Sequence, residues 1–524
     1  MKKILMTTAA LALVSAPALA AGEITVVRAI DANNYDPHKS TAQANAEIMF
    51  MLGDTLVSLA PDMKTIESGI AKEWEVSDDG LTYTFRLHDN VQFCDGKKLT
   101  ADDVVYSIER WIDPETNSPV AWRAGEVESV TAIDPFTVEY KLKSPFSELL
   151  YQLAQSFGTI IDKDTVEALG PDFGVAGFNG TGPFCWVEWT PRDKMIMDKH
   201  EAYTWGAPFH KNTGPASLDR ITWQIVPEEN TRTVAVMTGQ SEVSPYIPVI
   251  ALKQLESAPG VEVVRSDLAP YTYYIGFKID KETVSDPVVR RAINLAVDQE
   301  AMAEDLFFGE VEPAYSYVTQ DALDWNHDLD DTLLKYDPEA AKKMLDEAGW
   351  VPGDDGVRAK GGVRLSPLIY TFAESTYGKQ VEAVQSYLRE IGIDLQIESF
   401  DATVVWGKLA TQEFDMYTMG YPYVSSGDAL NLYFRSENIP TPNRMNWNDE
   451  KTDELLDAGA AATDDAERAK NYGEVLKMVH DAAAWLPLYH DPMVIVQSTD
   501  LETITPHNLY GAGLYKGLDL KFKE

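Results

Sequence analysis

No segment of this 524-residue chain is apolar for long enough to span a bilayer, which takes about 20 residues in an α-helix. At the N-terminus, two lysines precede a shorter apolar stretch over residues 4–14 that leads to Ala18-Leu19-Ala20. This order is typical of a cleavable secretory signal peptide, whereas a buried N-terminal helix would leave it unexplained. We expect residues 1–20 to be removed after Ala20. No cysteine stands at the cleavage point to carry a lipid anchor, so we expect a periplasmic protein.

Basic residues are in short supply, with 44 Lys and Arg against 83 Asp and Glu. The net charge of −39 becomes −41 when Lys2 and Lys3 leave with the signal peptide. Such an acidic surface repels phosphate backbones, so we expect no nucleic-acid partner. Removal of 20 of the 524 residues leaves 504. That length predicts roughly two to four domains with large cores of their own.

Cysteine is nearly absent, since the chain contains only Cys94 and Cys185. In an oxidising compartment an isolated pair favours one disulfide, acting as a structural staple and not as a redox centre. Two free thiols are the alternative, because the sequence does not fix how closely the two Cα atoms approach.

Several catalytic motifs are also missing. There is no Walker A sequence, no His-Glu-x-x-His and no Gly-x-Ser-x-Gly, since residues 239–243 lack the second glycine. Residues 324–329 begin like a calcium loop, but Leu329 and Lys335 stand where Gly and a bidentate Glu belong. The eight histidines are scattered. We therefore predict no catalytic residues, no metal and no cofactor; a hydrolase whose carboxylates converge in space is the alternative.

Strand and helix patterns alternate along the chain, which predicts a mixed α/β fold. Residues 81–87 alternate as a strand after the turn Asp78-Asp79-Gly80. Caps and periodicity predict helices over residues 100–111, 287–297, 337–349 and 378–391, and the last leads to a strand over 393–397. We expect positive φ at Gly80, Gly96 and Gly182.

Five blocks in sequence resemble the family-5 extracellular solute-binding proteins, the oligopeptide, dipeptide and nickel binders of ABC importers. They are Ile70-Ala71-Lys72-Glu73-Trp74 onward to residue 104, Gly180-Thr181-Gly182-Pro183-Phe184, and residues 289–298, 336–342 and 347–350. Their order and spacing match over almost the whole mature chain. Arg290 and Asp298, within the third block, are expected to satisfy a buried network or a cap and not to contact ligand.

The resemblance implies a type II periplasmic-binding-protein fold of two lobes, with an extra subdomain inserted in lobe one. The expected division is residues 21–60 for the start of lobe one, 61–179 for the inserted subdomain, 180–270 for the second part of lobe one, 271–489 for lobe two, and 490–524 for the return to lobe one. The chain would cross between the lobes near residues 271–277 and again near residues 485–489.

The function that the resemblance implies is capture of a peptide or peptide-like solute between the lobes and its delivery to the permease subunits of an ABC importer. Ligand that touches both lobes favours the closed state. We expect a monomer without enzymatic activity. The alternatives are an oligosaccharide, an opine or a metal chelate as cargo, or a secreted hydrolase or chaperone-like factor.

Related peptide binders carry a ligand-anchoring carboxylate in the loop after a Gly-Trp element. The matching loop, residues 419–428, has Tyr421 at the tryptophan position and Val424 at the acid. Asp428 could substitute for the acid or cap the following helix. Residues 371–377 lack the arginine that dipeptide binders tend to have. The remaining candidates are aromatic or carry hydroxyl or carboxyl groups: Tyr35, Tyr273, Tyr274, Tyr377, Tyr421, Tyr423, Ser425, Ser426 and Asp428.

Overall fold

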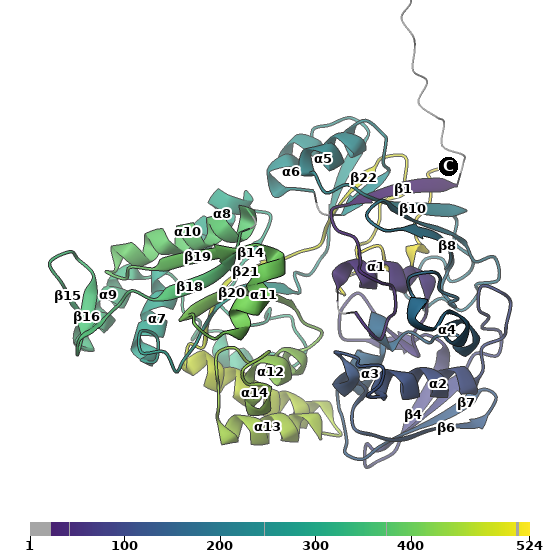
Figure 1. Ribbon diagram of the computed structural model, residues 1–524, viewed down its shortest axis with the longest axis horizontal. Helices are drawn as coiled ribbons and strands as arrows, with labels where there is room; N and C mark the ends of the chain where they lie inside the picture. The colour runs from purple at the N-terminus through teal and green to yellow at the C-terminus, as the bar shows by residue number, and fades with distance from the viewer. Residues whose placement is uncertain (1–21, 41, 246, 374, 510–512) are drawn as a thin grey trace, which may run out of the picture.

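The computed structural model describes residues 22–40, 42–245, 247–373, 375–509 and 513–524, without the side chains of residues 375–377 and 402–403. The expected signal peptide and the side chain of Tyr377 therefore lie outside the described residues. No helix among the described residues is long and apolar enough to cross a membrane. Figure 1 shows the chain as two halves, each built on a sheet of its own.

The first half, which we call lobe one, is built on a seven-stranded sheet in the described part of the chain, in the order β12-β22-β11-β1-β10-β9-β8. The strands are β1 (Glu23–Arg28), β8 (Phe184–Thr190), β9 (Lys194–Lys199), β10 (Arg220–Ile225), β11 (Val243–Pro245), β12 (Val261–Arg265) and β22 (Val494–Ser498). Its helices are α1 (Gln43–Leu52), α5 (Glu229–Met237) and α6 (Val249–Leu255). Strands distant in sequence pair directly, as β1 with β10 in parallel.

A smaller unit, which we call the inserted subdomain, extends lobe one below this sheet in Figure 1. Its described strands form a four-stranded antiparallel sheet and a short ribbon: β4 (Ala71–Val76), β5 (Thr82–Leu87), β6 (Val127–Asp134) and β7 (Thr137–Leu142), with β2 (Val57–Leu59) and β3 (Ile66–Ser68). Its helices are α2 (Ala101–Ile112), α3 (Leu149–Leu153), α4 (Lys163–Leu169) and the 3-10 turn η1 (Ala121–Ala124).

The second half, lobe two, has a six-stranded mixed sheet among its described residues, in the order β14-β21-β13-β20-β18-β19. The strands are β13 (Tyr271–Phe277), β14 (Glu312–Pro313), β18 (Leu368–Phe372), β19 (Gln396–Phe400), β20 (Met416–Pro422) and β21 (Trp485–Asp491). The helices are α7 (Pro287–Ala296), α8 (Gln299–Phe307), α9 (Pro338–Glu347), α10 (Ser375–Glu390), α11 (Ala402–Ala410), α12 (Ser426–Phe434), α13 (Glu450–Ala460) and α14 (Asp465–Asp481).

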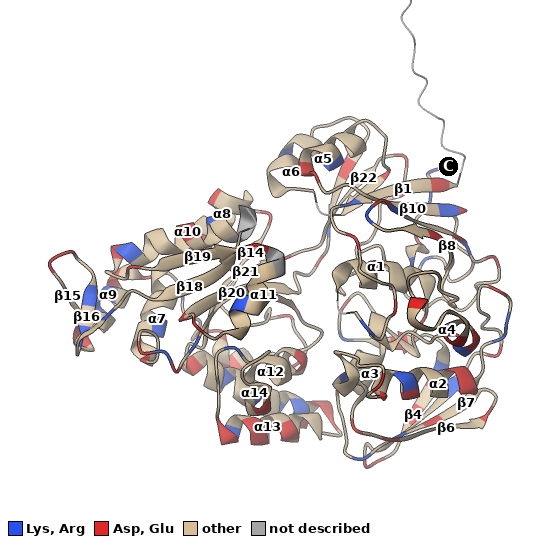
Figure 2. Ribbon diagram, in the orientation of Figure 1, with Lys and Arg blue, Asp and Glu red and all other residues tan. Residues whose placement is uncertain are grey.

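Short elements complete both halves. They are β15 (Val351–Pro352), β16 (Arg358–Lys360), β17 (Val363–Arg364), η2 (Ser156–Gly158), η3 (Gly170–Asp172), η4 (His327–Leu329), η5 (Ser436–Asn438) and η6 (Tyr515–Gly517). Acidic side chains are spread over both halves and are not gathered in one region (Figure 2).

Local sequence signals account for many of these elements. The predicted strand 81–87 and helix 100–111 are confirmed as β5 and α2, and a capping box of Thr100 and Asp103 begins the helix. Helices α7 and α9 begin at prolines after the caps Asp286 and Asp337, as predicted. Helix α10 begins three residues before the predicted start, and β19 begins three residues after it.

The structure tests the φ angles predicted for three glycines and the structural roles predicted for Arg290 and Asp298. Positive φ is confirmed at Gly80 and Gly96 but is wrong at Gly182. There a Cβ would lie 2.3 Å from the carbonyl oxygen of Met51, so close backbone approach is the reason for glycine. Arg290 donates to the carbonyl oxygens of Val284, Ser285 and Ala482, and Asp298 caps α8, which confirms structural roles for both.

Two short connections join the halves, one between β12 and β13 and one between β21 and β22. Strand β13 pairs with both β20 and β21, and Tyr271 lies opposite Pro422 on one side and Asp491 on the other. The first residues of β13 and the last residues of β20 and β21 therefore lie together, where these strands reach the two connections. Each lobe has buried clusters of its own, so the connections can act as a hinge.

Candidate functional site

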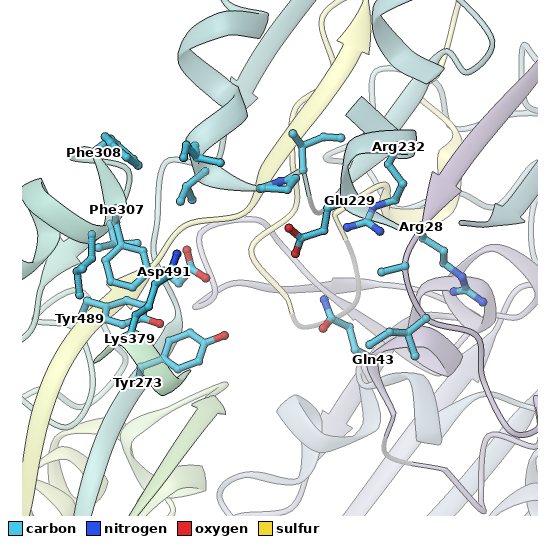
Figure 3. A pocket seen from close by; sticks show the side chains of 18 of the residues that line it. Arg28, Gln43, Glu229, Arg232, Tyr273, Phe307, Phe308, Lys379, Tyr489 and Asp491 are labelled. Atoms are coloured by element: carbon cyan, nitrogen blue, oxygen red, sulfur yellow. The ribbon is translucent and has the colours of Figure 1, made fainter. Parts of the chain in front are cut away.

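A cavity of about 740 Å³ lies between the two lobes beside the hinge. Figure 3 shows side chains from both lobes pointing into it. Lobe one contributes Arg28, Gln43, Glu47, Glu229 and Arg232, and lobe two contributes Tyr273, Phe307, Phe308, Lys379, Tyr489 and Asp491. Its size falls within the roughly 300–1,000 Å³ typical of pockets for small molecules.

The lobe-one wall is a rigid ion-paired cluster around Arg28, the last residue of β1. The buried Arg28 guanidinium donates to Glu47 at 3.0 Å, to Asp31 at 3.2 Å and to the Tyr35 hydroxyl at 2.7 Å. Tyr35 is fully buried and packs edge-on against Trp189 at 5.0 Å between ring centroids. Tyr35 therefore lies behind the wall and positions Arg28.

The lobe-two wall is an aromatic face. The rings of Tyr273 and Tyr489 stack at 4.6 Å, and Phe307 packs on the other side of Tyr489 at 4.4 Å. Gln380 donates a hydrogen bond of 2.6 Å to the Tyr489 hydroxyl. Since Tyr273 and Tyr489 come from the neighbouring strands β13 and β21, the sheet fixes the spacing of the rings.

Two charged groups on the lobe-two side have no partner among the described residues. Asp491, the last residue of β21, is half-buried, and its carboxylate makes no hydrogen bond or ion pair with the described side chains. Burial raises the pKa of Asp491 to about 7. Lys379, in the first turns of α10, is exposed and has no ion-pair partner in the described ranges. An uncompensated charge next to a cavity is a candidate anchor for ligand.

Loop 421–428 contacts the opposite lobe instead of lining this cavity. Arg123, on η1 of the inserted subdomain, donates to the Asp428 carboxylate at 2.8 Å and to the Tyr421 hydroxyl at 3.1 Å. The Tyr421 hydroxyl in turn donates to Asp428 at 2.6 Å, and the Gln152 amide donates to it at 3.3 Å. Burial alone would lower the pKa of Arg123, but Asp428 and Tyr421 raise it above its ordinary value. We call these four residues the interlobe network.

A second contact lies beside the interlobe network. Ser425 caps α12 by accepting from the Asp428 amide at 3.0 Å, and its hydroxyl donates to the Glu148 carboxylate at 2.7 Å. Burial raises the pKa of Glu148 to about 7, because Ser425 and Arg468 only partly offset the loss of water. Ser426 is fully buried in the same turn.

Besides Tyr35, which lies behind the lobe-one wall, the predicted residues that the structure describes fall into three places. Tyr273 lines the cavity, and Tyr421, Ser425 and Asp428 join the interlobe contacts. Tyr274 is buried in the lobe-two core, where its ring stacks on Trp485 at 3.7 Å. Tyr423 is also buried, and its hydroxyl bonds Thr319 at 2.7 Å.

Sequence reasoning missed Asp491, Lys379 and Phe307. A signal for the first existed, because Asp491 lies two residues after the strand predicted as the return crossing, residues 485–489, and polar residues at strand ends can form sites. Lys379 lies at the start of the helix predicted from residue 378, but nothing in its local sequence distinguishes it from other solvent-exposed lysines.

Cys94 and Cys185 form a disulfide with Cα atoms 5.7 Å apart, which joins the inserted subdomain to β8. His200 lies near both sulfur atoms, and these three side chains form the one group with metal-ligand spacing in the described ranges. The disulfide occupies both sulfurs, and His200 Nδ1 lies 2.9 Å from the carbonyl oxygen of Gly182. The group therefore offers no thiolate ligand.

Comparison with known proteins gives a consistent result. The family model described as bacterial extracellular solute-binding proteins, family 5 Middle, matches residues 65–439. The glutathione-binding protein GsiB of Salmonella typhimurium is 28% identical over 502 residues, which cover 93% of this chain and 92% of that protein. GsiB of Escherichia coli K12 is 27% identical over 508 residues, covering 94% and 93%.

Solved structures show the same fold. The periplasmic binding protein DppA from Helicobacter pylori, in complex with peptide STSA, aligns with a TM-score of 0.80 at 23% identity, covering 96% of this chain and 98% of that one. NikA from Brucella suis, in complex with Fe(III)-EDTA, aligns with a TM-score of 0.84 at 22% identity, covering 96% and 100%. The expected two-lobed type II fold is confirmed.

Proposed function

Since the chain belongs to family 5 of the bacterial extracellular solute-binding proteins, we propose that it captures a small peptide or peptide-like solute in the cavity between its lobes. The unpaired Asp491 binds an ammonium group of the solute, and Lys379 binds a carboxylate. The loaded protein delivers its cargo to the permease subunits of an ABC importer. It acts in the periplasm as a monomer without catalytic activity, after cleavage behind Ala20.

The observation that carries this proposal is the pair of uncompensated opposite charges at one aromatic wall. A peptide backbone ends in an ammonium and a carboxylate, so it complements Asp491 and Lys379. Tyr273 and Tyr489 offer ring faces and hydroxyl groups to the segment between these ends. A neutral sugar would leave both charges without a partner, which disfavours that cargo.

The relatives support the same class of cargo. Two are named glutathione-binding proteins, and glutathione is a tripeptide with one ammonium and two carboxylates at neutral pH. A further structure with this fold holds a tetrapeptide. Because both lobes line the cavity, a solute inside it makes more contacts in the closed state than in the open state. This difference in contacts favours closure.

The test is calorimetric titration of the mature chain with glutathione and with a set of unmodified tripeptides. Asp491→Asn and Lys379→Gln should each weaken peptide binding about tenfold or more, the usual loss when one charged hydrogen-bonded group is removed. Asp331→Asn and Lys343→Gln are matched controls, since both residues are exposed and do not line the cavity.

The pH dependence provides a second criterion. With a pKa of about 7, Asp491 is protonated in acid and loses its attraction for an ammonium. Affinity should therefore fall as pH drops from 8 to 6 in the wild type and stay flat in Asp491→Asn. Tight binding of a neutral sugar with no binding of peptides would contradict the proposal.

A further inference from the structure

The mouth of the cavity carries exposed apolar side chains on both lobes. Ile250 and Ile30 of lobe one are 72% and 71% exposed, the highest values among large apolar side chains in the described residues. Phe308 of lobe two is 53% exposed. All three line the same cavity, so they are grouped at one site and are not scattered over the surface.

The backbone holds Phe308 outward. Phe308 ends helix α8 in a left-handed conformation with φ 57° and ψ 28°, which residues other than glycine, asparagine and aspartate seldom adopt. Its neighbour Phe307 is only 5% exposed and packs on Tyr489. One phenylalanine therefore belongs to the aromatic wall, while the next is kept exposed at a strained position, as is common at functional sites.

The elements that carry these side chains face each other. Helices α6 and α8 lie on opposite sides of the gap between the lobes in Figure 1. Ile250 lies in the first turn of α6, and Phe308 directly follows α8. Figure 3 places Phe308 above Phe307 and away from Asp491 and Lys379, so on the lobe-two side this apolar side chain and the two charged groups occupy separate parts of one cavity.

From this division we infer that the solute is amphipathic, a small peptide with a bulky apolar side chain that lies between Ile250 and Phe308 while its charged ends meet Asp491 and Lys379. This inference rests on the proposed function and specifies its cargo. A bulky apolar side chain of the solute would cover Ile250, Ile30 and Phe308 and remove them from water. This burial adds affinity that a peptide with only small or polar side chains does not gain.

The experiment compares tri-alanine with tripeptides in which one alanine is replaced by leucine, phenylalanine or serine, titrated into the mature protein. Net charge is the same throughout the set. We expect the best leucine or phenylalanine peptide to bind about tenfold or more tightly than tri-alanine, and the serine peptides to show no gain.

Variants then assign the gain to the mouth. Ile250→Ser and Phe308→Asn should abolish the preference, so that each variant binds leucine, phenylalanine and serine peptides no more tightly than it binds tri-alanine. Asparagine is chosen at residue 308 because it tolerates the left-handed conformation. Ile133→Ser is the matched control, since Ile133 is 57% exposed on β6 and does not line the cavity.

Each other outcome overturns the inference. Equal binding of all peptides would refute the apolar subsite and leave the proposed peptide function standing. An equal loss for every peptide in Ile250→Ser would mean that the two sides of the mouth pack on each other on closure. Failure of every peptide to bind the wild type would remove the proposed function and this inference together.

Discussion

The interlobe network predicts that Asp428→Asn loosens the contact between the inserted subdomain and lobe two. Arg123 and Asp428 are 10% and 1% exposed, and they come from opposite lobes. The substitution leaves the Arg123 guanidinium buried without a counter-ion. It keeps the Gln152 oxygen as acceptor at 2.6 Å and the Trp122 ring at 4.7 Å, neither of which carries a negative charge.

The size of the effect follows from what each partner retains. Removing one member of a buried ion pair costs about 3–5 kcal/mol, and Asp428→Asn should lie in that range. Arg123→Met should cost less, about 2–3 kcal/mol, because Asp428 still accepts from Tyr421, Gln152 and the Val424 amide. The double variant should cost little more than Arg123→Met alone, which gives a coupling energy close to the cost of Asp428→Asn, about 3–5 kcal/mol.

The assay is hydrogen exchange measured by mass spectrometry, because it reports local opening in a chain too large for two-state unfolding. Exchange should accelerate by about 100-fold or more, as 3–5 kcal/mol implies, in η1 and α3 of the inserted subdomain and equally in α12 of lobe two. Lys141→Gln is the matched control, since its pair with Glu128 is exposed on one sheet and should leave exchange unchanged.

Two results would refute this reasoning. If Asp428→Asn accelerated exchange in α12 alone, the network would not connect the lobes. If the double variant cost the sum of the two single variants, the ion pair would have no coupling energy and the contact would depend on packing instead.

Three further predictions concern single sites. Reduction of the Cys94–Cys185 disulfide, whose cysteines are 91 residues apart, should destabilise the unit that it closes by about 4–5 kcal/mol and lower the denaturant midpoint of the reduced protein below that of the oxidised protein; an unchanged midpoint would contradict it. The pKa of Glu148 is raised from 4.5 to about 7, so the stability that this residue contributes should fall as pH rises from 4.5 to 7. Glu148→Gln should therefore have a higher melting temperature than the wild type at pH 8 and the same melting temperature at pH 4. A melting-temperature difference between the two proteins that does not change with pH would contradict this prediction. Gly182→Ala should lower the melting temperature markedly, since its Cβ would lie 2.3 Å from the Met51 carbonyl oxygen. Gly96→Ala is the control, because its Cβ would contact no atom and only the positive φ would be strained. Equal losses of melting temperature in the two variants would contradict the steric argument.

Local features of the fold were predictable because they depend on neighbours in sequence. The capping box at Thr100, the prolines after Asp286 and Asp337, and the alternation over residues 81–87 each specify a start or a periodicity within a few residues. Ordered blocks spread over the chain then indicated the family, and the scarcity of basic residues argued against nucleic acid as a partner.

The site was harder to predict because its character depends on which groups meet across the fold. Tyr273 and Tyr274 are adjacent and chemically identical, yet strand alternation places one at the cavity and the other beneath Trp485. Asp428 meets Arg123, which is 305 residues away, and becomes part of an ion pair. Asp491 meets no partner among the described residues and becomes a candidate anchor.

By itself, then, the sequence predicted export, indicated the family and specified the starts of several helices, since signal-peptide features, caps and periodicity are properties of contiguous residues. Only the tertiary structure decided which carboxylate is neutralised and which is left to face the cavity. The free energy of a buried charge depends on its nearest opposite charge, and that partner is brought close by the packing of the lobes and not by the local sequence.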